Sequence, residues 1–220
     1  MSEAKKGNKV LLYYNAYSGS GVFKNNLDYI VERCQEEGFQ VVPVRASKGY
    51  VIEETLANLE QNEYDRIIAA GGDGTINEVL NGITDFDRVR LGVIPTGSGN
   101  DFARNLGILR DTREDLREIT ACIDQEQNGE KLQRIDLGKV SWKGCEKPRI
   151  FGISAGAGLD AIVCKKALHS KLKKILNRFH LGKLTYLMLT VQTLFSMRTF
   201  QANVTTDGET ESYENMIFAA

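Results

Sequence analysis

Residues 66–78 read RIIAAGGDGTINE, a stretch that combines a strand pattern, a glycine-rich turn and the start of a helical pattern. Its first five residues, RIIAA, have the apolar pattern of a buried strand, and the spacing predicts a helix over 75–80. Three glycines stand between the strand and the helix, so the backbone there can approach a phosphate closely. The helix would turn its free N–H groups and its positive dipole end toward the same place. The stretch therefore predicts a phosphate-binding turn at the end of a strand.

The same alternation of strand and helix extends to both sides of this stretch. The patterns predict strands at 9–15, 39–44 and 89–94, and helices at 22–38, 51–59 and 112–126. Pro43 lacks an N–H donor, which favours an edge position for the strand that contains it. Strands that alternate with helices predict a parallel sheet covered on both faces. We therefore expect an α/β nucleotide-binding domain over residues 1–131.

The pattern changes after Asn128-Gly129, where two strand-like runs, KLQRIDLGKVSW and PRIFGISAG, follow in turn. Near the end, Asp207-Gly208 lies between two alternating segments and predicts a tight hairpin. Residues 161–200 interrupt the strands with helical spacing. We expect a β-rich, sandwich-like second domain over residues 132–220, with a helical insertion and with part of the sandwich missing.

Asp73 stands among the glycines, where a carboxylate is well placed to hold a metal–phosphate complex or to position a reacting group. The alternative is a plain glycine turn in which Thr75 is the helix N-cap. A second loop, PTGSGNDFAR at 95–104, also follows a strand, so we expect it to face the first loop across one crevice. Taken alone, Asp101 could be merely an N-cap residue and Arg104 a solvated charge.

A third loop, NAYSGSG at 15–21, follows the first strand. Lys24 occupies the place of the third glycine of a dinucleotide-binding G-x-G-x-x-G, and the second strand ends in VRAS without an acidic residue. No G-x-x-x-x-G-K-[ST] sequence is present, which excludes a P-loop NTPase. Backbone N–H groups of this loop and the Ser18 hydroxyl nevertheless suit phosphate oxygens.

The composition narrows the class of protein. Hydrophobic residues are 42% and charged residues 26% of 220, which excludes global disorder. Lys and Arg total 28 against 29 Asp and Glu, so the net charge is −1. A chain with this net charge does not attract nucleic acid as a whole. The N-terminal MSEAKKGNK has no apolar core of a signal peptide, and the four cysteines include no C-x-x-C pair. We expect a cytoplasmic protein with no nucleic-acid partner.

Residues 161–200 carry eight basic and no acidic side chains. One interpretation is a solvated basic face over a packed apolar stripe, formed by Leu184, Leu187, Met188, Val191, Leu194 and Phe195. The other is peripheral docking onto anionic lipid at the inner face of the membrane. The apolar stretch is too short to cross a bilayer.

GGDGTINEV, GSGNDFAR, the loop at 15–21 and RIDLG at 134–138 together resemble the catalytic domain of bacterial diacylglycerol kinases and related lipid kinases. Sphingosine and ceramide kinases are more distant relatives. Versions of GGDGT alone occur in NAD kinases and 6-phosphofructokinases, whereas GNDFAR and the RxDLG strand favour the lipid kinases. The resemblance covers nearly the whole chain.

This resemblance implies an ATP site between the two domains, with Mg²⁺ bound as Mg·ATP. The residues that would line the nucleotide are Asn15, Ser18, Gly19, Gly71, Gly72, Asp73, Gly74, Thr75, Ile76, Asn77 and Ser98. Asp73 and Asp101 match acidic positions on which catalysis in the family depends, and Asp73 is the best candidate contact to the metal. Ser98 stands where many members have Thr, and either hydroxyl could serve.

The resemblance also implies an ATP-dependent lipid kinase that transfers the γ-phosphate to the hydroxyl of diacylglycerol or a similar lipid. Family members continue well past Ala220, and the missing part supplies further strands and a carboxylate thought to be the general base. We therefore expect this chain to be inactive alone as a kinase while keeping weak affinity for ATP. The alternatives are an NAD kinase-like phosphotransferase and a non-catalytic nucleotide-binding or regulatory fragment. The oligomeric state stays open, with a homodimer among the alternatives.

Overall fold

The computed structural model describes residues 9–18, 22–36, 38–46, 66–97, 99–108, 133–169 and 182–220. The helices expected at 51–59 and 112–126, and the domain boundary expected near residue 131, lie outside these ranges. The chain forms two compact units, Met1–Ile153 and Ser154–Ala220.

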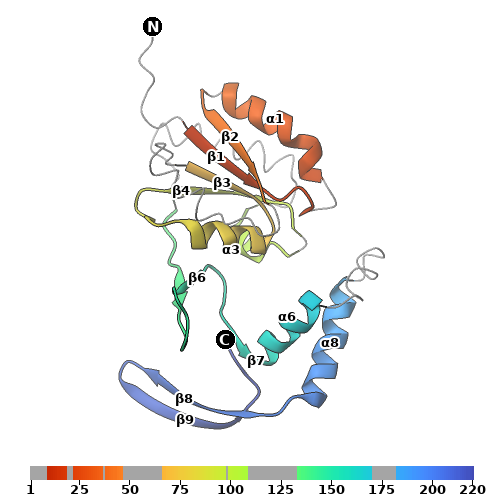
Figure 1. Cartoon of the computed structure of the whole chain (residues 1–220), viewed down its shortest axis with the longest axis vertical. Helices are drawn as coiled ribbons and strands as arrows, with labels where there is room; N and C mark the ends of the chain where they lie inside the picture. Colours follow the sequence, from red (N-terminus) through yellow and green to blue (C-terminus); the bar gives the residue numbers. More distant parts are fainter. Residues whose placement is uncertain are drawn as a thin grey trace. The chain divides into compact units, whose positions relative to one another are not determined.

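A parallel sheet of four strands forms the centre of the first unit (Figure 1). Its strands are β1 (Lys9–Tyr14), β2 (Gln40–Arg45), β3 (Arg66–Gly71) and β4 (Arg90–Pro95). Their order is β2-β1-β3-β4, so the strand that contains Pro43 lies at an edge, as predicted. The parallel sheet confirms the α/β fold that the alternating pattern indicates.

The two faces of the sheet are covered by different helices, because successive side chains of a strand point to opposite sides. Val10 and Leu12 pack on one face with residues of α1 (Val22–Glu36). Leu11 and Tyr13 pack on the other face with residues of α3 (Asp73–Gly82) and of the short helix α4 (Asp101–Asn105). Figure 1 shows α1 and α3 on opposite sides of the sheet. Burial on both faces explains why the strands read as unbroken apolar runs.

A short antiparallel pair completes the first unit and is fixed to α3 by one side chain. The pair consists of β5 (Gly138–Val140) and β6 (Arg149–Phe151), so the run expected to be a strand from residue 131 onward is a strand only over 138–140 among its described residues. The Asn81 Oδ1 atom accepts the Ile150 N–H at 2.8 Å, and its Nδ2 donates to the Ile150 carbonyl at 2.8 Å. This amide joins segments that lie 69 residues apart in the sequence.

Over its described residues, 154–169 and 182–220, the second unit contains antiparallel strand pairs and two helices. Its elements are β7 (Ala157–Gly158), α6 (Leu159–His169), α8 (Gly182–Ser196), β8 (Phe200–Thr206), β9 (Glu209–Met216) and β10 (Phe218–Ala219). Strand β7 pairs with β10, and β8 pairs with β9. Asp207 and Gly208 form the tight turn between β8 and β9 with φ of 54° and 88°, so the predicted hairpin is confirmed.

Helices α6 and α8 meet through a polar contact, and α8 leaves its apolar side chains outside. The Lys166 Nζ atom donates to Thr193 Oγ1 at 3.0 Å, and Thr193 is fully buried. Five apolar side chains of α8 are instead exposed, with Phe195 reaching 86%, whereas Leu189 is partly buried. The five exposed residues are Leu187, Met188, Val191, Leu194 and Phe195. The interpretation of these five residues as part of a packed stripe is therefore wrong, and the side chain of Leu184, the sixth residue of that stripe, lies outside the described part of the structure. No helix within the described ranges is long and apolar enough to cross a membrane.

Candidate functional site

The glycine-rich loops gather at the carboxyl edge of the sheet. Asn15 follows β1, Gly72 follows β3, and Thr96 follows β4. The chain leaves β1 toward β2 on one side of the sheet, whereas β3 and β4 lie on the other side. The switch point therefore falls between β1 and β3, and open α/β sheets bind ligands in the crevice at such a point.

The amino end of α3 faces this crevice with uncapped donors. Gly72 is the N-cap residue in an extended conformation, and no side chain caps the helix. Thr75 lies inside the helix, so the alternative in which Thr75 is the N-cap is wrong. A Cβ added at Gly74 would meet nothing within 4 Å, so the space beside the first turn is open. Free N–H groups and the positive end of the helix dipole together favour an anion at this position.

The second loop touches the first loop through backbone atoms. A Cβ added at Gly97 would lie 2.5 Å from the Gly72 Cα, a separation that no real side chain tolerates. Next to this contact, the Thr96 N–H donates to the Gly71 carbonyl at 2.9 Å. Glycine at both positions therefore allows the two loops to lie against each other, and the sequence expectation that they face one crevice is met by direct contact.

Asp73 links the two loops through its carboxylate. The Asp73 Oδ1 atom accepts the backbone N–H of Phe102 at 3.1 Å, across 29 positions of sequence. A Cβ added at Gly99 would lie 2.8 Å from Asp73 Oδ2 and 3.7 Å from Asp101 Oδ2, so both carboxylates border the space beside Gly99. Asn100, not Asp101, is the N-cap residue of α4, so the alternative role of Asp101 as an N-cap is wrong.

Arg104 is held at the same loop and is not a free solvated charge. Its guanidinium donates to the Gly99 carbonyl at 2.8 Å and forms an ion pair with Asp101. Both side chains are about half exposed, so this ion pair contributes little to stability. Its effect is to orient the Asp101 carboxylate beside Gly99.

The loop after β1 uses much of its hydrogen-bonding capacity internally. The N–H of Asn15 donates to the Ala70 carbonyl at 2.9 Å, and that of Ser18 donates to the Asn15 carbonyl at 3.1 Å. The N–H of Tyr17 donates to the Asn15 side chain at 3.0 Å. Among residues 15–18, the described part of this loop, a phosphate would therefore meet the Ser18 hydroxyl rather than these three N–H groups.

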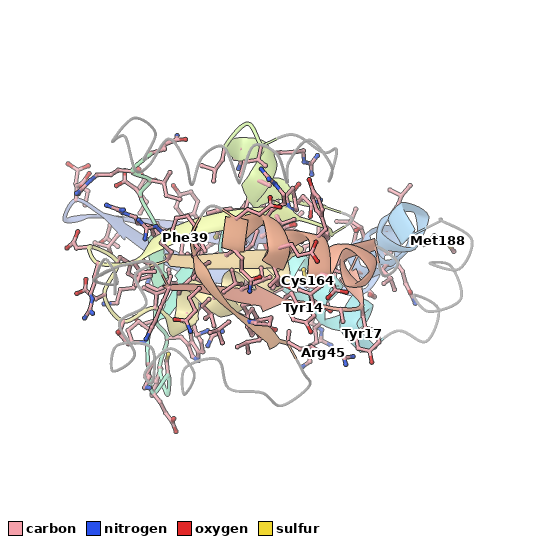
Figure 2. The ribbon with its side chains drawn as sticks, turned by 90° about the horizontal axis from the view of Figure 1, so that it is seen from above. Tyr14, Tyr17, Phe39, Arg45, Cys164 and Met188 are labelled. Atoms are coloured by element: carbon pink, nitrogen blue, oxygen red, sulfur yellow. The ribbon has the colours of Figure 1, made fainter. Side chains whose placement is uncertain are left out.

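Tyr17 and Arg45 form a pair at the outer side of the crevice. The Arg45 guanidinium lies 5.2 Å from the centre of the Tyr17 ring, and both residues are labelled in Figure 2. Arg45 is the last residue of β2, and Tyr17 lies three residues after the end of β1. The Tyr17 side chain is 80% exposed. Such cation–π contacts stabilise exposed sites by about 0.5–1 kcal/mol. The pair gives this end of the sheet an aromatic surface.

A sequence profile of the diacylglycerol kinase catalytic domain matches residues 9–140, which hold all three loops. The chain belongs to this family. The diacylglycerol kinase of Bacillus subtilis is 33% identical over 208 residues, which are 94% of this chain and 62% of the relative. That of Staphylococcus saprophyticus is 32% identical over 209 residues, again 94% and 62%. This chain therefore spans about 62% of the length of these curated relatives.

Solved structures agree with the family assignment. A crystal structure of a diacylglycerol kinase from Bacillus anthracis str. Sterne has a TM-score of 0.61 and 25% sequence identity to this chain. The match covers 97% of this chain and 63% of that one. The similarity therefore includes both compact units of the described structure.

Apart from Asn15 and Ser18 in the loop after β1, the residues that the family resemblance implies have different places in the structure. Gly71, Gly72, Asp73 and Gly74 lie at the crevice. Thr75 and Ile76 are 5% and 2% exposed, and Ile76 belongs to the core between α3 and the sheet. The exposed amide of Asn77 is bonded to Asn81 one turn further along α3. Gly19 and Ser98 lie outside the described residues.

Two further residues of the diacylglycerol kinase-like site escaped the sequence analysis. The Asn100 amide bonds twice to Gly97, with Oδ1 accepting the N–H and Nδ2 donating to the carbonyl, each at 2.9 Å. Asn100 has a φ of 56°, a conformation that Asn tolerates better than most residues. The buried Thr96 Oγ1 has no hydrogen-bond partner among the described residues. The sequence signal for Asn100 is its position between Gly99 and the start of α4, but no local pattern reveals its partners.

Proposed function

We propose that this protein is an ATP-dependent lipid kinase of the diacylglycerol kinase type, which transfers the γ-phosphate of ATP to a lipid hydroxyl. The observation that carries this proposal is the uncapped amino end of α3 at the switch point of the sheet. Its supports are the match to the family profile and the diacylglycerol kinase names of the relatives. Diacylglycerol is the substrate that these names suggest.

The proposed transfer forms a bond between the lipid oxygen and the γ-phosphorus and breaks the bond to the β-phosphate oxygen, so that ADP leaves. Catalysis of such a reaction rests on positioning and on stabilisation of charge. In this proposal the N–H groups of Asp73 and Gly74 bind phosphate oxygens, and Gly74 leaves room for them. The Thr75 N–H already donates to the Gly72 carbonyl at 2.9 Å. We assign no proton acceptor for the lipid hydroxyl among the described residues.

The residues present fit a magnesium ion that arrives with the nucleotide. Mg²⁺ is usually bound by one or two carboxylates together with substrate phosphates. Asp73 and Asp101 border one small space beside Gly99, and Asp73 Oδ2 faces it. Within the described ranges, no three His, Cys, Asp or Glu side chains form a cluster that could hold a metal ion alone. When bound, the ion would neutralise charge on the phosphates, while Asp73 and Asp101 would hold it at the junction of the loops.

Binding and turnover experiments test different parts of this proposal. The described loops predict that the 220-residue chain binds Mg·ATP in a calorimetric titration, and Gly72→Val, which adds a β-branched side chain at the N-cap, should abolish binding. Phosphate transfer from labelled ATP to diacylglycerol, sphingosine and NAD identifies the acceptor, and it is measured with this chain and with the longer relative from Bacillus subtilis as a positive control. Transfer to NAD in preference to both lipids would replace the proposal by an NAD kinase. Nucleotide binding without transfer to any acceptor would support a regulatory module.

We also propose peripheral contact with an anionic membrane, because α8 presents exposed apolar side chains within residues 161–200, a segment with eight basic and no acidic side chains. Apolar side chains insert at the headgroup boundary, and each nearby basic residue adds about 1 kcal/mol. Phe195 is the most exposed of these apolar side chains at 86%. Replacing Phe195 by Ser should therefore weaken sedimentation with vesicles that contain phosphatidylglycerol.

A charge-reversal experiment separates this docking from general electrostatic attraction. Lys171, Lys173 and Lys174 changed together to Glu should weaken vesicle binding at least about tenfold, from their combined attraction. The matched control is the same triple change at three exposed lysines of the first unit, Lys139, Lys143 and Lys147. Equal losses in the two triple variants would mean that net charge alone, and not the segment at 161–200, governs binding.

A further inference from the structure

Asn100 is more than the residue that begins α4. Its side-chain amide matches the Gly97 backbone on both sides, because an amide offers one acceptor for the N–H and one donor for the carbonyl. Both bonds are 2.9 Å, and Asn100 is only 7% exposed. Asp lacks the donor, Ser and Thr are shorter, and Gly has no side chain. At a φ of 56°, Asn is thus the residue type that supplies this pair of bonds.

The amide closes the second loop on itself and thereby places Gly97. Gly97 in turn lies against Gly72, the N-cap residue of α3, at a separation that leaves no room for a Cβ. The Asp73 carboxylate, in the first turn of α3, accepts the backbone N–H of Phe102, two residues after Asn100. The second loop is therefore held against the first at both of its ends, by the contact of Gly97 with Gly72 and by the bond from Phe102 to Asp73.

We infer that Asn100 is a positioning residue for the nucleotide, acting through Gly97 on the amino end of α3. This inference rests on the proposed function, since it assumes that phosphate binds at that end. The Asn100 amide bonds to the Gly97 backbone, so its proposed effect on the nucleotide is indirect. Without the Asn100 amide, Gly97 can move away from Gly72. The contact with Gly97 then no longer holds the N–H donors in the first turn of α3 in place.

The variant Asn100→Gly tests this role, because glycine adopts the same φ without strain and removes only the amide. A matched control exists at Asn215, which has a φ of 59° in the second unit and is exposed. We expect Asn100→Gly in the 220-residue chain to bind Mg·ATP at least about tenfold more weakly, equivalent to about 1.4 kcal/mol. Asn215→Gly should bind within about twofold of the unaltered protein, well under that difference.

Amide hydrogen exchange distinguishes positioning from a merely structural role. The Gly97 amide should exchange faster in Asn100→Gly, and so should the amides of Gly72, Asp73 and Gly74 on the facing loop. A merely structural role would lower the unfolding temperature of Asn100→Gly and Asn215→Gly alike and leave nucleotide affinity unchanged. Unchanged affinity together with unchanged exchange at residues 72–74 would overturn the inference.

Two further outcomes are also decisive. If the unaltered chain does not bind Mg·ATP, the proposed function fails, and exchange at residues 72–74 alone then decides whether Asn100 positions the loop. If Asn100→Gly does not fold, Asn100→Asp replaces it, because aspartate keeps the acceptor for the Gly97 N–H. Asn100→Asp should protect the Gly97 amide yet increase exchange at residues 72–74. Protection of both would overturn the inference.

Discussion

Replacing Gly74 by alanine should make the protein more stable and yet a poorer nucleotide binder. Gly74 is the second residue of α3, and an added Cβ would meet nothing within 4 Å. Glycine within a helix costs about 0.5–1 kcal/mol relative to alanine. For a chain of this size, recovering that free energy raises the unfolding temperature by about 1–4 °C.

The same methyl group enters the space where we place the phosphate. Helical Cα–Cβ bonds tilt toward the amino end, so the methyl group that Gly74→Ala adds would project toward the uncapped N–H groups. A hydrogen bond to a charged group is worth about 1.5–3 kcal/mol. Losing one such bond would weaken Mg·ATP binding about ten- to a hundredfold. Stability and affinity should therefore change in opposite directions.

Differential scanning calorimetry and isothermal titration calorimetry measure the two effects on one preparation. Gly92→Ala is the matched control, because Gly92 lies within β4 and its added Cβ would make an ordinary contact of 3.5 Å with Ile68. That control should be at least as stable as the unaltered protein and bind Mg·ATP equally well. A Gly74→Ala protein that is more stable and binds Mg·ATP with unchanged affinity would refute the placement of phosphate on α3.

Gly97→Ala should lower the free energy of unfolding by about 1–3 kcal/mol in urea, because the loop backbones must separate; unchanged stability would contradict their contact. Asp73→Asn should keep the fold, since an amide oxygen still accepts the bond from the Phe102 N–H, but should abolish the proposed phosphate transfer; normal turnover would exclude the role assigned to Asp73. The Glu211 carboxylate accepts a hydrogen bond from the Tyr213 hydroxyl and thereby raises the pKa of that phenol above its ordinary value. The contribution of this hydrogen bond to the free energy of unfolding is present at pH values below the ordinary pKa of tyrosine. It is lost as the pH rises through the raised pKa of Tyr213. Glu211→Gln should therefore lower the Tyr213 pKa in a carbon-detected NMR titration, and an unchanged midpoint would count against this hydrogen bond.

Local sequence patterns determined the elements of this protein. The apolar runs predicted β1 to β4 because each strand contributes side chains to the apolar clusters on both faces of the sheet. Pro43 predicted an edge strand because it cannot donate to a neighbour. Asp207-Gly208 predicted the hairpin because both residues tolerate positive φ. In each case the physical cause lies within a few residues of the pattern, so the sequence alone was sufficient.

Only the tertiary structure decided how the site is assembled. The bond from Phe102 to Asp73 spans 29 residues, and the bonds between Asn81 and Ile150 span 69. Periodicity cannot reveal such contacts, because it reports which face of an element is apolar and not what lies opposite. The apolar stripe of α8 shows the same limit, since Leu194 and Phe195 follow core spacing and are nevertheless exposed. Spacing fixes the side of the helix on which a residue lies, whereas burial depends on whether another part of the protein packs against that side.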